Sequence, residues 1–321
     1  MQRSESMATV VVNYGSSRLL EANLADMAGS GPVIVVDNPT TRAERERVHA
    51  LAARHGWDIV DAPSNLGFGG GVNLGAARAF DSGAAEILVL NPDARIDAEA
   101  VRALRRAVTD DRMSLVSPRV VDPDGKTWFA GLDLVVADGT IRSPRRRAEF
   151  PDDHVVEWLS GACLLVTAEV WKASGGFDDE YFLYWEDVDF SRRVTDAGGR
   201  LRVVHDAVAI HDEGGTQRDG EHRSQAKSEL YYYFNIRNRM LYAARHLDAA
   251  AVRSWQRSSV RAARAVLLRG GRRQFLRPVA PIRAAWRGLR DGRRIADAAL
   301  AGSPLRAGQY TPSTTHRKAT T

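Results

Sequence analysis

The first third of the chain alternates short apolar runs with segments of helical periodicity, and this alternation restricts the fold more than any other feature. The apolar runs are continuous, which is typical of parallel strands covered on both faces. The order strand, helix, strand predicts an α/β fold of the doubly wound type, with a mostly parallel sheet flanked by helices. The predicted strands are Thr9–Tyr14, Val33–Asp37, Trp57–Val60 and Glu86–Leu90, and the predicted helices are Leu19–Met27, Arg42–His55, Val72–Phe80 and Ala98–Val108.

The pattern becomes mixed from Ser114 onward. The segment 122–125 (Asp-Pro-Asp-Gly) predicts a hairpin, and the polar segment 139–153 predicts a surface loop. Further strands are predicted over Leu115–Val121, Val155–Thr167 and Leu201–His211, and further helices over Asp187–Ala197 and Lys227–His246.

Charge is distributed unevenly along the chain. From Arg237 onward there are 19 Lys and Arg against three Asp, whereas the preceding residues carry a net negative charge. No run approaches the roughly 18 apolar residues that a membrane span requires, and the N-terminus lacks the apolar core of a signal peptide. With one cysteine, Cys163, the chain forms no internal disulfide. We therefore expect a cytoplasmic protein with a strongly basic C-terminal part.

The basic part contains two amphipathic segments in which arginines lie opposite apolar residues. In the first, Val252, Trp255, Val266 and Leu267 oppose Arg253, Arg257, Arg261 and Arg264; in the second, Ile282, Trp286 and Leu289 oppose Arg283, Arg287, Arg290 and Arg294. This design predicts binding to an anionic membrane at the inner face of the plasma membrane. A solvated face or a contact within a homo-oligomer is the alternative. We divide the chain into a main domain at 1–245, a basic helical extension at 246–301 and a disordered tail at 302–321.

Polar residues follow four of the predicted strands, at Asn13, at Asp37, in the loop 63–71 and at Asn91-Pro92-Asp93. Ligands of open α/β sheets bind at the carboxyl ends of strands. Turn residues alone would explain one such strand end, but four on one rim favour a ligand site.

The segment 65–73 (Asn-Leu-Gly-Phe-Gly-Gly-Gly-Val-Asn) lies between a predicted strand and a predicted helix. Its glycines permit close approach of the backbone, and a helix start offers free N–H groups to a diphosphate or a sugar. No Lys follows the glycines, so this is not a nucleoside-triphosphate phosphate loop. We expect Asn65, Gly67 and Asn73 to contact such a ligand.

Asp93 is a candidate ligand for Mg²⁺ or Mn²⁺, because these cations bind few protein carboxylates and take further oxygens from substrate phosphates. His211 closes a predicted strand and is a second candidate for a metal or phosphate contact. The segment 175–190 contains six acids, and four aromatic residues, Tyr181, Phe182, Tyr184 and Trp185, lie between them just before a helix. Flat apolar faces beside carboxylates suit a sugar, so we expect Trp185 and Glu186 to contact an acceptor.

These motifs, in this order over residues 8 to about 245, resemble the bacterial inverting glycosyltransferases with a GT-A fold, and most closely their rhamnosyltransferase-like branch. The matching segments are V-V-V-N-Y (10–14), V-V-D-N (35–38), N-L-G-F-G-G-G-V-N (65–73), L-N-P-D (90–93), S-G-A-C-L-L-V (160–166), G-G-F-D-D-E-Y-F-L-Y-W-E-D-V-D-F (175–190) and R-N (237–238).

The resemblance implies roles for individual residues. Asp37 would contact the base of a nucleotide-sugar donor, with Asn13 lining the same pocket. Asn91-Pro92-Asp93 stands where many relatives have Asp-x-Asp, so that Asp93, with His211, would hold the metal on the diphosphate. Asp187 matches the catalytic base. The implied reaction moves a sugar, with rhamnose from dTDP-rhamnose as the first expectation and UDP-sugars next, to a hydroxyl of a glycan or a polyprenyl-diphosphate-linked acceptor in cell-envelope polysaccharide synthesis.

Two other functions fit parts of the sequence. A nucleotidyltransferase acting on sugar phosphates also pairs an α/β sheet with a metal-binding Asp, but the first strand end lacks the Lys that would bind a triphosphate. A non-enzymatic protein that binds an anionic polymer would explain the basic extension. The acidic main domain opposes nucleic acid, so we expect no nucleic-acid partner.

Overall fold

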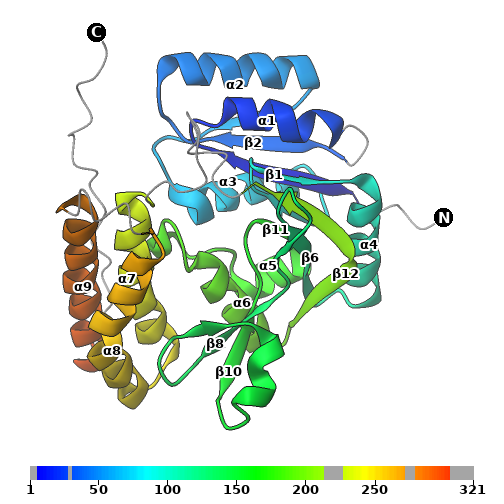
Figure 1. Cartoon of the computed structure of the whole chain (residues 1–321). Helices are drawn as coiled ribbons and strands as arrows, with labels where there is room; N and C mark the ends of the chain where they lie inside the picture. Colours follow the sequence, from blue (N-terminus) through cyan, green and yellow to red (C-terminus); the bar gives the residue numbers. More distant parts are fainter. Residues whose placement is uncertain (1–5, 28–30, 213–226, 272–278, 304–321) are drawn as a thin grey trace.

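The computed structural model describes residues 6–27, 31–212, 227–271 and 279–303. A twisted central sheet has the strand order β3-β2-β1-β4-β11-β6-β12-β5, with β7 paired to β6 (Figure 1). Its strands are β1 (Met7–Asn13), β2 (Val33–Asp37), β3 (Asp58–Asp61), β4 (Glu86–Leu90), β5 (Ala94–Ile96), β6 (Ser114–Val121), β7 (Thr127–Phe129), β11 (Cys163–Thr167) and β12 (Arg200–His211).

The strands β3, β2, β1 and β4 are parallel, as the sequence predicts. Beyond β4 the sheet is mixed, because β11 runs antiparallel to both β4 and β6. The pairing sets Cys163 opposite Leu90, so the start of β11 meets the end of β4. This reversal brings the residues that precede β11 to the rim where the parallel strands end.

Helices cover both faces of the sheet, which confirms the predicted α/β architecture. On one face α1 (Ser17–Leu24), α2 (Arg42–His55) and α4 (Ala98–Asp110) bury side chains such as Leu20, Leu51 and Leu104. On the other face lie α3 (Gly67–Asp81), α5 (Ala168–Ser174) and α6 (Glu186–Asp196). The 3₁₀ turns η1 (Ala25–Met27) and η3 (Asp179–Tyr181) complete this part of the chain.

The glycine-rich segment corrects one prediction, because it is the start of α3 and not a loop. The reason is packing against the sheet. A Cβ at Gly71 would lie 2.7 Å from a methyl carbon of Val12, and one at Gly75 would lie 2.5 Å from a methyl carbon of Val10. The glycines therefore let α3 approach β1 more closely than any other residue would allow.

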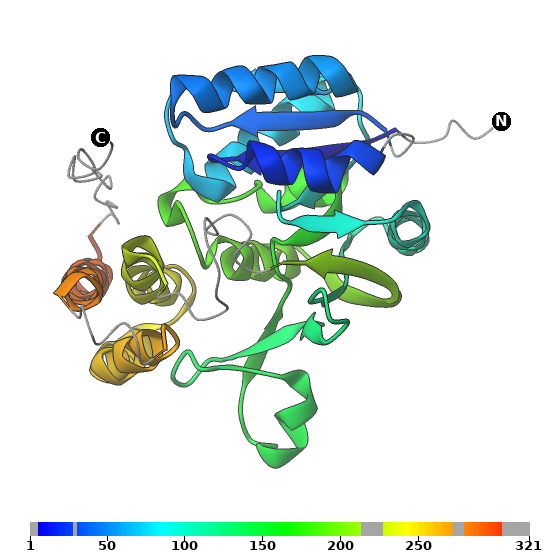
Figure 2. The same cartoon turned by 45° about the horizontal axis from the view of Figure 1, so that its top comes forward.

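Residues 132–158 form a lobe that projects away from β1 and β2 (Figure 2), and here two predictions were wrong. The segment predicted as one strand, Val155–Thr167, forms two strands in different sheets, because residues 159–162 turn the chain from one sheet into the other. The predicted surface loop 139–153 contains regular structure. The elements of the lobe are β8 (Leu132–Val135), β9 (Ile141–Arg142), η2 (Pro144–Glu149) and β10 (Val155–Trp158).

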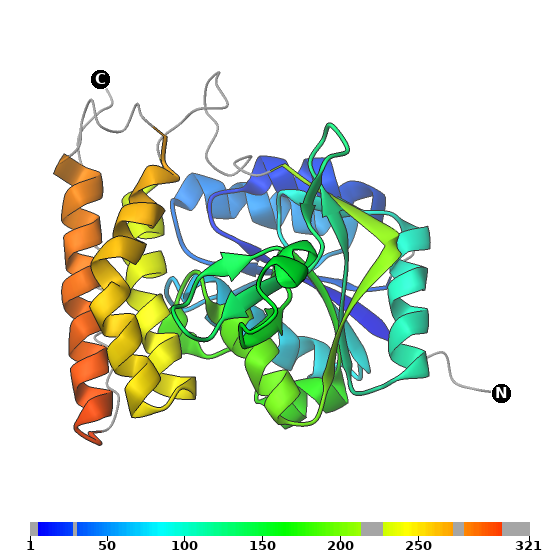
Figure 3. The same cartoon turned by 60° about the horizontal axis from the view of Figure 1, so that its bottom comes forward.

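The C-terminal helices pack side by side as a bundle next to the sheet, with α7 nearest to the sheet (Figure 3). They are α7 (Glu229–His246), α8 (Ala249–Leu268) and α9 (Val279–Leu300). In α8 the predicted apolar face is confirmed, since Val252 and Trp255 are buried. No helix among the described residues is both long and apolar enough to cross a membrane. The predicted disordered tail lies outside the described residues from residue 304 onward.

Two of the large apolar side chains predicted for one face of α9 do not pack against the rest of the protein. Ile282 and Trp286 are 52% and 59% exposed, and α9 packs through small residues instead. A Cβ at Gly288 would lie 2.8 Å from the carbonyl oxygen of Tyr233 on α7. Close helix contact through glycine and alanine thus turns the large apolar side chains outward.

Candidate active site

The turn Gly161-Ala162, just before β11, is where the predicted site segments meet. The amide of Asn91 donates to the carbonyl oxygen of Ala162 at 3.0 Å, and the amide of Gly161 donates to Asp187 Oδ2 at 3.1 Å. The ring of Phe68, from the start of α3, also lies against this turn, since a Cβ at Gly161 would lie 2.9 Å from it. The strand end that carries Asp93, the start of α6 and the start of α3 are therefore neighbours.

Asp93 and His211 lie together, as predicted. A carboxylate oxygen of Asp93 is 3.1 Å from His211 Nε2, and the two side chains are only 8% and 6% exposed. The sheet causes this pairing, because β12 runs antiparallel to β5 with His211 opposite Ala94. His211 Nδ1 is buried without a hydrogen-bond partner, and the His211 ring lies 4.6 Å from that of Trp128.

Asp187 is in the first turn of α6, with its carboxylate held by backbone amides. Gly161 and Val188 donate to its two oxygens at 3.1 and 2.9 Å. Burial raises the pKa of Asp187 from 3.8 to about 6, although these amides oppose the shift by stabilising the charge. At pH 7 roughly 90% of such a group is ionised, so it can accept a proton.

The two residues predicted to contact an acceptor are both buried. Glu186 is 6% exposed, its Oε2 has no hydrogen-bond partner, and burial together with the charge of Asp187 raises its pKa well above the ordinary value. Trp185 is 7% exposed, and its ring lies 5.7 Å from that of Tyr242 and 6.2 Å from that of Trp255. Trp185 thus joins α6 to the bundle, and the structure gives its ring little surface for an acceptor.

Asn13 and Asp37 adjoin each other at the ends of β1 and β2, as the sequence predicts. Asn13 Nδ2 donates to Asp37 Oδ1 at 2.7 Å, and both residues are almost fully buried. Asn38, which the sequence argument left without a role, accepts a hydrogen bond from the amide of Leu66 and donates to the carbonyl oxygen of Gly67, both at 3.0 Å. The side-chain amide of Asn38 therefore links the start of α3 to the end of β2.

Asn65 and Asn73 stand at the two ends of the glycine segment. Asn65 Oδ1 accepts from the amide of Gly67 at 3.0 Å. Asn73 Nδ2 donates to the carbonyl oxygen of Phe177 at 2.8 Å and to Asp179 Oδ1 at 2.7 Å. Asn73 Oδ1 accepts from the amide of Phe177 at 2.9 Å. Asn73 thus anchors the acidic segment to α3, and its contact with a ligand stays a prediction.

The ion pair between buried Asp189 and Arg193, which the sequence did not predict, supports α6 behind Asp187. Asp189 accepts hydrogen bonds from Tyr181 Oη at 3.1 Å and Arg193 Nε at 2.8 Å, and His246 Nε2 lies 2.7 Å away. Burial alone would raise the pKa of Asp189, but the hydrogen bonds from His246 and Arg193 and the charge of Arg193 outweigh it, and the pKa is lowered. His246 ends α7, so the bundle contributes to the support of the helix that carries Asp187.

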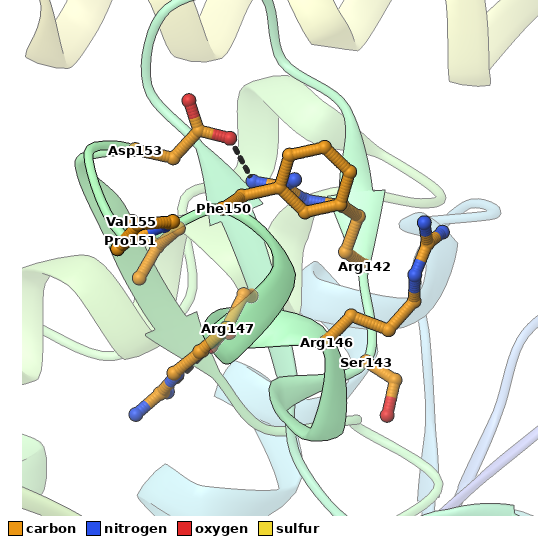
Figure 4. A pocket seen from close by; sticks show the side chains of 9 residues that line it. Arg142, Ser143, Arg146, Arg147, Phe150, Pro151, Asp153 and Val155 are labelled. Carbon is orange, nitrogen blue, oxygen red and sulfur yellow. Dashed lines mark hydrogen bonds and ion pairs between the residues drawn. The ribbon is translucent and has the colours of Figure 1, made fainter.

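In the described ranges no cluster of three or more His, Cys, Asp and Glu is arranged to hold a metal ion. A cavity of about 130 Å³ lies in the projecting lobe, lined by side chains between Asp133 and Val155 (Figure 4). Its arginines Arg142, Arg146 and Arg147 each form an ion pair with a carboxylate. That cavity therefore offers an anionic ligand little uncompensated charge.

Among curated proteins, the chain is 29% identical over 260 residues to an N-acetylglucosaminyl-diphospho-decaprenol L-rhamnosyltransferase of Mycobacterium tuberculosis, which covers 72% of this chain and 84% of that protein. It is 26% identical over 252 residues to the low-salt glycan biosynthesis hexosyltransferase Agl10 of Haloferax volcanii, covering 74% of this chain and 75% of that protein.

Solved structures share the fold at low sequence identity. The mannosyltransferase PcManGT of Pyrobaculum calidifontis, solved with GDP-Man and Mn²⁺, has a TM-score of 0.51 and 14% identity, and covers 94% of this chain and 88% of that chain. GalNAc-T7, solved with UDP, GalNAc and Mn²⁺, has a TM-score of 0.54 and 12% identity. The match covers 79% of this chain and 55% of that chain. Residues 86–285 match the family described as glycosyl transferase family group 2, and the chain therefore belongs to this family of GT-A glycosyltransferases.

Proposed function

We propose that this glycosyltransferase inverts the anomeric carbon of a nucleotide-diphosphate sugar in a single displacement, with Asp187 as the catalytic base. The observation that supports this most is the meeting of three segments at Gly161-Ala162. In that turn the amide of Gly161 donates to the carboxylate of Asp187. The carbonyl oxygen of Ala162 accepts from the amide of Asn91, two residues before Asp93. A leaving diphosphate and an incoming hydroxyl would each find its partner residue on the same rim.

Asp187 would accept the proton of the acceptor hydroxyl as its oxygen attacks the anomeric carbon and the bond to the diphosphate breaks. The two backbone amides keep the carboxylate oriented through this transfer. A base with a pKa near 6 is ionised at neutral pH and is a better proton acceptor than an ordinary aspartate.

Asp93 and His211 fit a divalent cation such as Mn²⁺ or Mg²⁺. Their oxygen and nitrogen atoms are 3.1 Å apart at a strand end, and the second His211 nitrogen has no partner among the described residues. Two protein ligands match a cation that takes its other ligands from a diphosphate and water. When bound, the cation would neutralise charge on the leaving diphosphate.

For the donor we propose dTDP-rhamnose first and UDP-sugars second, and for the acceptor a polyprenyl-diphosphate-linked saccharide. The similarity to a rhamnosyltransferase named for a diphospho-decaprenol substrate supports both choices. Family membership argues against a nucleotidyltransferase and against a protein without catalytic activity.

The test uses the purified chain with Mn²⁺ and a panel of nucleotide sugars, measuring release of the nucleoside diphosphate. Asp187→Asn should fold and lose transfer by at least about a hundredfold, the range typical of a removed general base. Asp196→Asn, at the exposed end of the same helix, is the matched control and should retain activity. Full activity of Asp187→Asn would remove Asp187 from the mechanism.

We further propose that the outer face of α9 binds anionic lipid. Val279, Ile282 and Trp286 are 75%, 52% and 59% exposed and share one helix face, and the guanidinium of Arg290 lies 5.4 Å from the Trp286 ring. Residues 248–271 and 279–303 carry ten Arg against three Asp. Apolar side chains within a cationic surface complement an anionic bilayer, where a polyprenyl-linked acceptor would lie.

Vesicle flotation tests this surface. The chain should float with vesicles containing phosphatidylglycerol and not with pure phosphatidylcholine, and Trp286→Ala should weaken flotation severalfold. Trp128→Ala, at another partly exposed tryptophan, is the control for residue type. Equal flotation of the Trp286→Ala variant and the wild type would contradict the assignment of α9.

A further inference from the structure

Three residues in the short segment before Asp187 adopt a backbone conformation that residues with side chains disfavour. Phe182, Tyr184 and Trp185 have φ values of 61°, 65° and 75°, and they are the only non-glycine residues with positive φ among the described residues. Phe182, with ψ of −53°, is the centre of a γ-turn closed by a 2.7 Å hydrogen bond from the Leu183 amide to the Tyr181 carbonyl oxygen. Such backbone conformations are energetically unfavourable for residues with side chains, so other contacts must hold the segment.

Those contacts come mainly from one amide on α7. Asn238 is fully buried, and its Nδ2 lies 2.8, 2.9 and 2.7 Å from the carbonyl oxygens of Tyr181, Leu183 and Tyr184, which share its two N–H donors. Arg237 donates to Asn238 Oδ1 at 2.6 Å, which fixes the direction of the amide. A single side chain therefore supplies two N–H donors to three carbonyl groups of a strained turn.

The same turn also contacts the glycine-rich start of α3. The Phe182 carbonyl oxygen accepts a hydrogen bond from the Phe68 amide at 2.8 Å. A Cβ at Gly67 would lie 2.0 Å from that oxygen, so Gly67 is required for the approach. Residues 181–185 therefore connect the start of α3 on one side to the first turn of α6, with Asp187, on the other.

We propose that Asn238 is a positioning residue, which holds the turn 181–185 so that the start of α3 and the carboxylate of Asp187 keep their relative placement. This inference rests on the proposed function of Asp187. It assigns α7 a part in transfer although Asn238 itself touches no reacting group.

Asn238→Asp tests the proposal, because aspartate has the same shape but accepts hydrogen bonds where the amide donates them. Asn235→Asp is the matched control, since Asn235 lies one turn earlier on α7 and, among the described residues, its side chain donates only to the Tyr231 carbonyl oxygen of its own helix. Per folded molecule, Asn238→Asp should lower kcat at least about tenfold, which corresponds to the loss of one to two hydrogen bonds. Asn235→Asp should keep kcat within about threefold.

Two further measurements separate positioning from a general loss of stability. Hydrogen exchange of the Phe68 and Leu183 amides should accelerate in Asn238→Asp, whereas exchange of β1 amides should not. The acid limb of the pH profile should move toward lower pH, because a displaced Asp187 regains solvent and its pKa falls toward the ordinary value. If Asn238→Asp does not fold, Asn238→Ser, which keeps one O–H donor, is used instead. It should show the same changes in kcat, amide exchange and pH profile, with smaller magnitudes.

The outcomes are distinct for the two proposals. An inactive wild type, or an Asp187→Asn variant as active as the wild type, rejects the proposed function. An active wild type with Asn238 variants that match Asn235→Asp in kcat, pH profile and amide exchange rejects the positioning role alone.

Discussion

Replacing Asp187 by asparagine should change the pH dependence of stability in a direction that the structure fixes. Burial raises the pKa of this carboxyl from 3.8 to about 6 in the folded protein. A carboxyl with a raised pKa destabilises the folded state above that pKa, where the buried group is charged. The destabilisation disappears as the pH falls through the ordinary value of 3.8, where the group is neutral in both states.

The size of the effect follows from the shift. About two units at about 1.4 kcal/mol each give an upper bound of about 3 kcal/mol. Since the side chain of Asp187 is half-buried, solvent screening reduces this to about 1.5–3 kcal/mol. Asparagine also places an NH₂ group against an amide of Gly161 or Val188, which costs about 1–2 kcal/mol at every pH. Only the first contribution depends on pH.

Urea unfolding at pH 7, 5.5 and 4 measures the difference between Asp187→Asn and the wild type. Between pH 7 and pH 4 the wild type should gain about 1.5–3 kcal/mol relative to the variant. Asp196→Asn corrects for the loss of one carboxylate from α6. A stability difference that stays constant between pH 7 and pH 4 would refute a buried, charged Asp187.

Three further outcomes are expected. The value of kcat/KM for the acceptor should fall about tenfold per unit below pH 6, as Asp187 becomes protonated, and a profile flat to pH 5 would contradict this. Gly75→Ala should lower the free energy of unfolding by about 1–3 kcal/mol through overpacking, and Gly70→Ala, whose Cβ would have more space, by less, as measured by urea unfolding. Asp93→Ala and His211→Ala should each raise the Mn²⁺ concentration needed for half-maximal transfer without changing circular dichroism, and an unchanged Mn²⁺ requirement would argue against their role as ligands.

The sequence predicts those features that depend on local periodicity and on the order of strands. Asn13 and Asp37 end two buried apolar runs, and parallel strands bring their ends to one rim, so their contact at 2.7 Å was predictable. For Asn13 and Asp37 the pattern of a few neighbours determines both the element and its direction. The proximity of Asp93 and His211 was implied by the family resemblance alone, because it depends on the pairing of β12 with β5, a strand that the sequence did not predict.

Features that depend on the shape of a distant partner were not predictable in this way. Glycine is a poor helix former, so residues 67–71 predict a loop, yet they are helical and Gly71 packs closely against β1. Ile282 and Trp286 define an apolar face on α9, yet glycines on another face allow a closer approach to α7 and leave both side chains exposed. In both cases the tertiary contact outweighs the local preference.

The segment before Asp187 shows why the remaining part of the site is the least predictable. Large aromatic residues disfavour positive φ, so the local preference at Phe182 and Trp185 opposes the observed backbone. The compensation comes from Asn238, whose amide bonds to a carbonyl group 57 residues away in the sequence. A conflict between local preference and global structure is expected where function requires a fixed geometry. Here the conflict lies between the start of α3 and Asp187, the proposed base, whose relative placement the proposed transfer would require.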